Sequence, residues 1–302
     1  MAKWEGKSRG TVLGHKIFVF ILNHLGLKPA YIVLRLVALY YFLFARKSNK
    51  TSFYFYHEVL KYKKTTAYLK IYKNYYLFGQ TILDKVALMA GVKTNFTINH
   101  EGGDQLDKIA AMGKGGILIS AHIGNWEIAG QLLNRLNTTF NILMYENERE
   151  NLKKYMDGVQ KKKNVKIIAI KDGEMGHLIE LHNAFSNNEL VVMHGDRFRD
   201  GVQTLEATFL GKKALFPAGP FIMAAKFGVP LSVVFSVKES DSHYHFFASE
   251  PIEVKRARTP EQTEKAVQEL LQKYLAEVEK MVLRYPEQWF NFYAFWKEQG
   301  EN

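Results

Sequence analysis

A histidine and a glutamate with four residues between them are the first candidates for chemistry in this sequence. His122 and Glu127 lie in the run Ile-Ser-Ala-His-Ile-Gly-Asn-Trp-Glu, which begins at Ile119. Within one helix, positions five apart point about 140° away from each other. A turn between the two residues removes that restriction, so Glu127 can reach back and fix the tautomer of the His122 imidazole. Such a pair is a general base suited to deprotonating a hydroxyl or an amine.

The surroundings of this pair favour a site at the end of a strand. An apolar, strand-like run covers 116–120, and a helix-like run follows the motif at 128–133. Ligands in α/β proteins usually bind at such strand ends. Between the two runs, we expect the backbone amides of Gly124 and Asn125 to offer an oxyanion site. The alternative is a structural histidine followed by ordinary turn residues.

Strand-like and helix-like segments alternate after residue 113. The strand-like runs are 116–120, 140–144, 165–170, 189–193 and 230–237. The helix-like segments lie near 126–136, 150–163, 173–186 and 218–227. This alternation predicts an α/β fold with a largely parallel central sheet flanked by helices. We also expect 243–249 to add an edge strand.

The last long helix carries its own start signal. Thr259 is the expected N-cap, Pro260 the first helical residue, and Gln262 completes a capping box. Apolar residues at helical spacing then predict one buried face. They are Val267, Leu270, Leu271, Tyr274, Val278, Met281, Val282 and Tyr285.

The N-terminal region is the most apolar part of the chain. Residues 17–22 and 30–45 are apolar apart from Arg35, and a polar interruption separates them. The second run is shorter than the roughly 20 residues of a clean membrane span. We therefore predict a helical hairpin that anchors the protein at a membrane interface. A single span and a buried core helix are the alternatives. Amphipathic helices rich in tyrosine are expected over 52–90.

Composition narrows the classes of partner and chemistry. The chain has 302 residues, no cysteine and a net charge of +11, so disulfides and thiolate nucleophiles are excluded. Basic residues gather at 46–73, next to the apolar region, which is typical of a segment facing anionic lipid. A second cluster contains Lys161, Lys162 and Lys163, and a solvated helix face is its alternative. No nucleic-acid-binding module is present in the sequence, so we expect no nucleic-acid partner.

Other catalytic patterns do not match. The glycines at 113–116 lack the spacing of a phosphate-binding loop, and no Gly-x-Ser-x-Gly elbow is present. His177, His182 and His194 do not form a zinc-binding pattern, because no His-Glu-x-x-His motif occurs. We therefore predict neither a metal site nor a cofactor.

Several segments together resemble one family. The motif at 119–127 is similar to the signature of the bacterial lipid A late acyltransferases, relatives of the glycerolipid acyltransferases. The runs 194–197, 209–220 and 285–290 resemble that family's later blocks, in the same order, and the segment 4–14 also fits. The resemblance covers nearly the whole chain.

The resemblance implies a reaction and a set of residues. His122 acts as general base and Glu127 orients it, while Asp196 and Arg197 contact substrate. Three more residues of the family's substrate-facing loop are implied as substrate contacts: Gly211, Pro217 and Gly219. The implied donor is an acyl-carrier protein or acyl-CoA, and the acceptor is a lipid. The implied location is the cytoplasmic face of the inner membrane.

The acceptor and the division into domains are less specified. The C-terminal run 289–296 looks more like acyltransferases associated with aryl polyene or flexirubin-type lipids. Lipid A, such a pigment lipid and an aminolipid therefore stay open as acceptors, and a non-catalytic lipid carrier is the contrasting class. We predict an anchor at 1–50 and an acyltransferase domain at 51–302, with a helical lead-in at 51–112 and an α/β core at 113–302.

Overall fold

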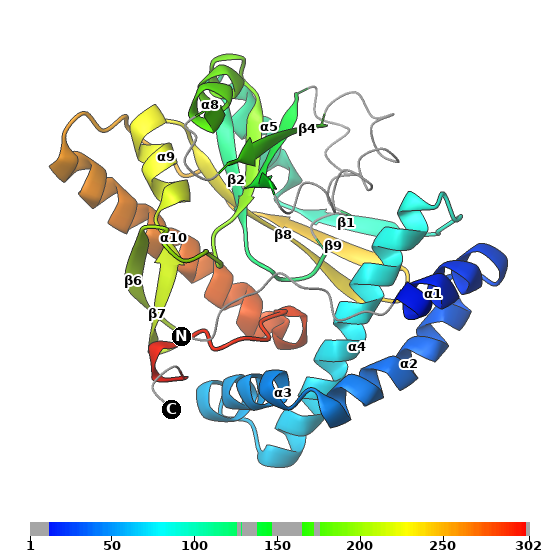
Figure 1. Ribbon diagram of the computed structural model, residues 1–302. Helices are drawn as coiled ribbons and strands as arrows, with labels where there is room; N and C mark the ends of the chain where they lie inside the picture. The colour runs from blue at the N-terminus through cyan, green and yellow to red at the C-terminus, as the bar shows by residue number, and fades with distance from the viewer. Residues whose placement is uncertain (1–11, 126–127, 129–137, 147–164, 172–175, 300–302) are drawn as a thin grey trace.

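A mostly parallel sheet lies at the centre of the molecule, with helices on both faces (Figure 1). The computed structural model describes residues 12–125, 128, 138–146, 165–171 and 176–299. The predicted fold class is therefore confirmed: an α/β fold with helices flanking a largely parallel sheet.

The elements follow one another in mixed order. The helices are α1 (Val12–His24), α2 (Leu27–Phe44), α3 (Arg46–Phe53), a π-helical turn (Tyr54–Val59), α4 (Lys64–Met89), α5 (Gly103–Ala111), α8 (Gly176–Ser186), α9 (Gly219–Phe227) and α10 (Pro260–Arg284). The strands are β1 (Thr97–Glu101), β2 (Gly116–Ser120), β3 (Phe140–Tyr145), β4 (Val165–Ile170), β5 (Leu190–His194), β6 (Thr204–Phe209), β7 (Lys212–Pro217), β8 (Leu231–Ser240) and β9 (His243–Ala248).

Strand β2 is central in the sheet, whose order is β1-β9-β8-β2-β5-β3-β4. It pairs in parallel with β5 on one side and β8 on the other. All five of its residues are buried, as expected of a strand covered on both faces. Ile117 and Ile119 join the core beneath α9 and α10, whereas Leu118 joins the core beneath α5. Because successive side chains of a strand point to opposite faces of the sheet, β2 contributes to the core on each face.

One prediction about the strands is wrong, and one pair of strands was not predicted. Strand β9 is not an edge strand, because β1 pairs with it in parallel and takes the edge. The burial pattern of β1 explains why the sequence did not reveal it: none of its five residues is buried. The antiparallel hairpin of β6 and β7 was also not predicted. It turns at Leu210 and Gly211, both with positive φ.

The start of α10 is as predicted. The side chain of Thr259 accepts a hydrogen bond from the backbone of Gln262, and Gln262 completes the capping box. Seven of the eight apolar residues predicted for its buried face are buried, and Tyr285 forms the C-cap. This helix packs beside α9 over the face of the sheet that carries Ile117 and Ile119.

The N-terminal helices form a hairpin that turns at Gly26, whose φ is 84°. Residues Ala30, Tyr31, Leu34 and Ala38 of α2 are buried, and the cluster they belong to includes Leu83 and Ala87 of α4. Of the helices described, α2 alone is long and apolar enough to cross a membrane. One side of α2 packs on α4, which lies beyond the predicted domain boundary at residue 50. The division into an anchor and an acyltransferase domain stays a prediction.

Candidate active site

The candidate site lies at the carboxyl ends of two neighbouring parallel strands. Ser120, the last residue of β2, is in register with His194, the last residue of β5. His122 follows two residues after Ser120, and Asp196 follows two residues after His194. The pairing of β2 with β5 therefore brings His122 close to His194 and Asp196, which are 72 and 74 residues further along the chain.

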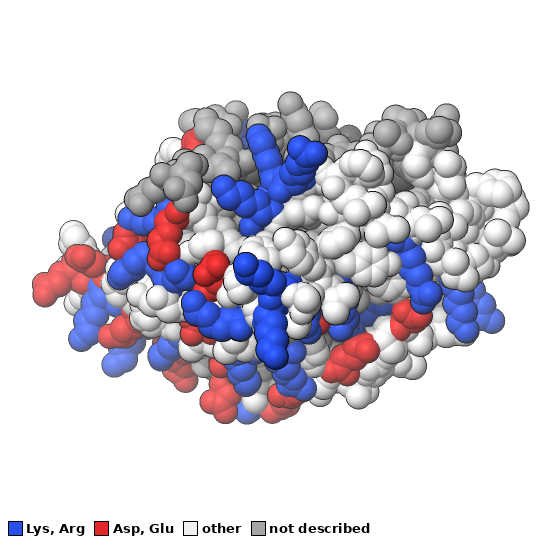
Figure 2. Space-filling view, turned by 90° about the horizontal axis from the view of Figure 1, so that it is seen from below, with Lys and Arg blue, Asp and Glu red and all other residues white. Residues whose placement is uncertain are grey.

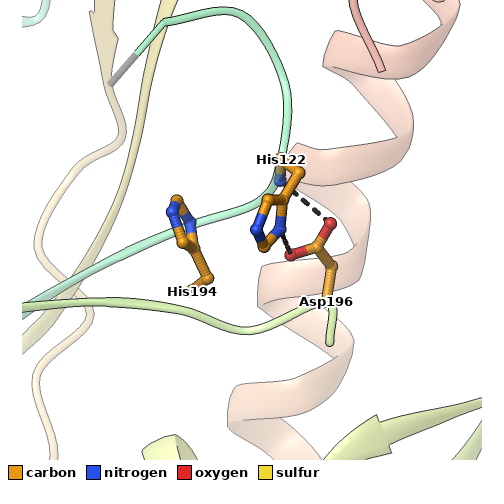
Figure 3. A group of neighbouring side chains, drawn as sticks. All are labelled: His122, His194 and Asp196. Carbon is orange, nitrogen blue, oxygen red and sulfur yellow. Dashed lines mark hydrogen bonds and ion pairs between the residues drawn. The ribbon is translucent and has the colours of Figure 1, made fainter. Parts of the chain in front are cut away.

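His122 and Asp196 form a hydrogen-bonded pair (Figure 3). The Nδ1 atom of His122 lies 2.7 Å from Oδ1 of Asp196, and the backbone N–H of His122 donates to Oδ2 at 2.9 Å. The Asp196 side chain is 3% exposed and that of His122 is 27% exposed. With an ionised Asp196, the proton of the imidazole belongs on Nδ1, so the second ring nitrogen, Nε2, is left as the base.

The electrostatics of the pair agree with this assignment. Burial opposes ionisation of Asp196, but His122 and Arg197 outweigh it and hold the pKa of the carboxyl well below its ordinary value. Desolvation and the charge of Arg197 lower the pKa of His122, and Asp196 opposes them. The site is therefore a carboxylate beside a neutral imidazole at neutral pH, which is the state of a general base.

His194 packs against the same imidazole. The two rings have centroids 4.3 Å apart and are tilted by 35°. Desolvation, followed by the neighbouring His122, lowers the pKa of His194 to about 3. The sequence pointed to His194 only as part of the third block and as a rejected metal ligand. Its position at a strand end, one residue before Gly195-Asp196, is the signal that could have placed it in the site.

His122, His194 and Asp196 are also the residues to test as metal ligands, because their ligand atoms lie within 4.8 Å of one another. Two ligands of a tetrahedral zinc ion, each bonded at about 2.1 Å, are about 3.4 Å apart. The His122 and Asp196 atoms are only 2.7 Å apart, and both oxygens of Asp196 already accept from His122. The geometry fits a hydrogen-bonded pair better than a metal centre.

The loop 122–125, called the His122 loop below, runs beside the C-terminal segment. The N–H of Gly124 donates to the main-chain oxygen of Gln288 at 2.9 Å, and that of Phe290 donates to the oxygen of His122 at 2.9 Å. The N–H of Asn125 donates to the oxygen of Ser236 at 2.6 Å. Both amides thus have main-chain acceptors in this structure, and the oxyanion role of Gly124 and Asn125 stays a prediction.

Gly124 has a local reason to be glycine. Its φ is 69°, and a Cβ atom there would lie 2.0 Å from the main-chain oxygen of Ser236. The close approach of the His122 loop to β8 therefore requires this residue to lack a side chain.

Arg197 and Asp196, the two predicted substrate contacts of the third block, both contact neighbouring protein groups. The guanidinium of Arg197 donates to the main-chain oxygen of Phe290 and lies over the ring of Tyr293, 5.6 Å from its centroid. The Asp196 carboxylate faces His122 instead of open space. Contact of Arg197 with an anionic substrate stays a prediction.

The remaining predicted residues divide into two groups. Gly211 lies in the turn of the β6–β7 hairpin, Pro217 ends β7, and Gly219 begins α9. No hydrogen bond or ion pair within the described ranges joins these three to His122. Glu127 lies outside the described residues, as do Lys161, Lys162 and Lys163.

Comparison with known proteins places the chain in a family. The sequence matches the bacterial lipid A biosynthesis acyltransferase family over residues 69–298. The chain belongs to this family, which confirms the resemblance and the predicted class, an acyltransferase family. The matched segment includes His122, His194 and Asp196.

Two curated relatives are more distant. Both are phosphatidylinositol mannoside acyltransferases of Mycobacterium tuberculosis, from strains H37Rv and CDC 1551. The first is 28% identical over 148 residues, which are 45% of this chain and 46% of the relative. The second is 29% identical over 132 residues, 43% of this chain and 41% of the relative. The alignments thus span less than half the length of these relatives.

One solved structure is similar at low level. The crystal structure of the 1-acyl-sn-glycerophosphate acyltransferase PlsC from Thermotoga maritima superposes with a TM-score of 0.36 and 17% identity. The match covers 82% of this chain and 98% of that one. A similarity of this size adds nothing to the argument about the site.

Proposed function

We propose that this protein transfers a fatty acyl group from a thioester donor to a hydroxyl of a lipid acceptor. The observation that supports it best is the His122–Asp196 pair, with one imidazole nitrogen bound to the carboxylate and the other turned away from it (Figure 3). Membership of a lipid acyltransferase family supports the same reaction.

The proposed mechanism uses one proton relay. Nε2 of His122 takes the proton of the acceptor hydroxyl while its oxygen attacks the thioester carbonyl carbon. The tetrahedral intermediate then expels the thiolate, which takes the proton back from the imidazolium. Asp196 holds the Nδ1 proton and stabilises the imidazolium between the two steps.

The proposed acceptor is a glycolipid with a free sugar hydroxyl. The family is described by lipid A biosynthesis, and both curated relatives are named for phosphatidylinositol mannoside. Lipid A precursors and phosphatidylinositol mannosides are both phosphorylated glycolipids. Aryl polyene, flexirubin-type and aminolipid acceptors are the alternatives, and a non-catalytic lipid carrier is the contrasting class.

Acyl transfer by the purified protein tests the reaction. Radiolabelled acyl-carrier protein and acyl-CoA are offered in turn with a lipid A precursor, a phosphatidylinositol mannoside and an aminolipid. His122→Ala serves as the blank for each pair. Labelled product with wild type alone supports the proposal. Lipid binding without transfer from any donor would favour the carrier.

The proposed location is an interface of the inner membrane, on its cytoplasmic face. The outward side of α2 carries exposed apolar residues: Ile32, Leu36, Leu39, Tyr40, Leu43 and Phe44. Exposed basic residues follow in α3, in the turn before α4 and at the first residue of α4: Arg46, Lys47, Lys50, Lys61, Lys63 and Lys64. In a view from below, basic side chains, with acidic ones among them, lie beside a wide uncharged stretch (Figure 2). Apolar and basic surfaces side by side suit anionic lipid.

An interfacial position fits α2 better than a span, because its inner side is packed on α4. Leu36→Asp with Leu43→Asp should reduce sedimentation with anionic vesicles. Ile179→Asp with Leu283→Asp is the matched control, since these residues are equally exposed but lie on α8 and α10. Equal binding by both double variants would refute this face as the membrane contact.

A further inference from the structure

The side chain of Gln288 makes a paired contact that the proposed mechanism does not use. It is 4% exposed and lies in the C-terminal segment beside the His122 loop. Its Oε1 accepts from the backbone N–H of Lys238 at 2.8 Å, and its Nε2 donates to the oxygen of Lys238 at 2.8 Å. A side-chain amide thus pairs with the main chain of β8 as a neighbouring strand would. Only a residue with both a donor and an acceptor at this reach makes both bonds.

The main chain of Gln288 connects this contact to the catalytic residue. Its oxygen accepts from Gly124, and two residues later Phe290 donates to the oxygen of His122. The backbone of His122 is therefore held from two sides, by Phe290 at its oxygen and by Asp196 at its N–H. The direction of the imidazole depends on these bonds, because the ring follows its own backbone.

Lys238 is itself fixed by a buried cluster of four side chains: Tyr31, Asp84, Lys238 and Tyr244. The Nζ atom of Lys238 lies 2.6 Å from Asp84 and donates to the Tyr31 hydroxyl at 3.0 Å. The hydroxyls of Tyr31 and Tyr244 both donate to Asp84. The exposed fractions of the Lys238 and Asp84 side chains are 1% and 0%. A residue held this firmly gives Gln288 a rigid point of attachment.

The same cluster reaches the His122 loop by a second route. The side-chain amide of Asn125 donates to the Tyr244 hydroxyl at 3.4 Å and to the oxygen of Thr81 on α4 at 3.2 Å. Tyr31 comes from α2 and Asp84 from α4. Helices of the N-terminal region and the His122 loop are thus parts of one hydrogen-bonded assembly.

We propose that Gln288 is a positioning residue, which holds the His122 loop in register with Asp196 by tying it to Lys238 and the buried cluster. This inference rests on the proposed role of His122 as general base. A displacement of the loop by about 1 Å would separate the imidazole from its carboxylate, and misplacement of that size costs about 100-fold in rate.

Gln288→Met tests the proposal against Gln80→Met. Gln80 is 1% exposed and donates to Asp241 at 2.8 Å, near the same cluster, but no bond within the described residues joins it to the His122 loop. We expect Gln288→Met to lower kcat about tenfold or more, with KM for the acyl donor changed less than about twofold. Both variants should lower the Tm by similar amounts, because each removes a buried side-chain amide. Gln80→Met should nevertheless change kcat less than about threefold.

Hydrogen exchange gives a readout that does not need activity. The amides of Gly124 and Phe290 should exchange faster in Gln288→Met and at the wild-type rate in Gln80→Met. A wild type that transfers no acyl group would refute the proposed function, while exchange alone would still decide the role of Gln288. If Gln288→Met does not fold, Gln288→Glu replaces it. That variant keeps the acceptor for the N–H of Lys238 and loses the donor. The proposal would be overturned if the amides of Gly124 and Phe290 exchanged at the same rates in the Gln288 and Gln80 variants and both variants lost kcat equally.

Discussion

Two groups of ionisable side chains differ in their access to solvent: one follows the ends of β2 and β5, and the other joins β8 and β9 to α2 and α4. In the candidate active site, the His122 side chain is 27% exposed, and no hydrogen bond within the described ranges engages its second ring nitrogen. In the buried cluster, Lys238 and Asp84 are almost completely enclosed, and the ammonium has three oxygen partners. In the first group one ring nitrogen is left for a proposed substrate, whereas in the second group the ammonium is fully engaged.

The difference has a physical cause in the cost of burying charge. A buried ion pair remains folded only when its remaining donors and acceptors are satisfied. The Lys238 ammonium meets this condition through Asp84, Tyr31 and the main-chain oxygen of Asp241. A proton-transferring group needs the opposite arrangement, because its acceptor site must be empty when the substrate arrives. We therefore expect substitutions in the first group to affect rate and those in the second to affect folding.

His122→Ala should have the largest effect on rate and a smaller effect on stability than changes in the buried cluster. Loss of a general base costs about 100-fold to 10,000-fold in kcat. The His122 side chain is 27% exposed, and Asp196 keeps the backbone N–H of residue 122 when the imidazole is lost, so the protein should stay folded with a smaller loss of Tm than a change in the buried cluster causes. Acyl transfer and thermal unfolding, measured on the same preparation, check the two parts. A variant with wild-type turnover would remove His122 from the mechanism.

Lys238→Met should have the largest effect on stability. It leaves Asp84 buried without its ion-pair partner, which costs about 3–5 kcal/mol in unfolding free energy. Adding Asp84→Asn should restore much of this loss, because the charge is removed and the tyrosine hydroxyls keep a partner. Lys280→Met is the control, since its pair with Glu277 is largely exposed and worth at most about 1 kcal/mol. Urea unfolding gives the three values, and a Lys238→Met loss no larger than that of Lys280→Met would contradict the contrast between the two groups.

The same contrast explains what the sequence could predict. His122 was found because a histidine after a buried strand is a local pattern, and the α10 start because a capping box is local as well. Asp196 was found, but its role was missed, because its contact with His122 depends on the pairing of β2 with β5 across 74 residues. The acceptors of the Gly124 and Asn125 amides could not be predicted for a similar reason: they come from Gln288 and Ser236, which are distant in the chain.

The buried cluster was missed completely. Its members come from α2, α4, β8 and β9, and no spacing in the sequence connects them. Lys238 appears in the chain as the first charged residue after the mostly apolar run 227–237, and such a residue ordinarily marks the end of a strand. Only tertiary packing distinguishes a buried lysine from a solvated one.

Substitutions beside His122 should move its pKa in opposite directions. Desolvation and Arg197 lower the pKa of His122, and Asp196 raises it. Arg197→Met should therefore raise the pKa, so activity is lost at a higher pH as the solution is acidified. Asp196→Asn should lower the pKa, and it should also reduce kcat about tenfold or more because the tautomer is no longer fixed.

The pH dependence of kcat/KM with a soluble acyl thioester measures both shifts. Arg197→Lys is the matched control, because it keeps the charge and should leave the acid limb near the wild-type position. If the acid limbs of the two pH profiles, for Arg197→Met and for Asp196→Asn, moved in the same direction, the electrostatic account of this site would be contradicted.

His194→Gln should have the smallest effect near neutral pH, and it should change stability only in acid. The pKa of His194 is about 3 in the folded protein, below its ordinary value of 6.5. The unfolded chain therefore takes up a proton first as the pH falls through 6.5, and the folded state loses stability from there down to about pH 3. One such proton contributes up to about 1.4 kcal/mol per pH unit. His194→Gln should remove this contribution from the slope of unfolding free energy against pH. It should leave the unfolding free energy near pH 7.5 within about 1 kcal/mol of wild type. Urea unfolding at several pH values, with the exposed His24→Gln as control, measures the slope. An unchanged slope in His194→Gln would mean that the packed ring takes up its proton as readily as it does in the unfolded chain.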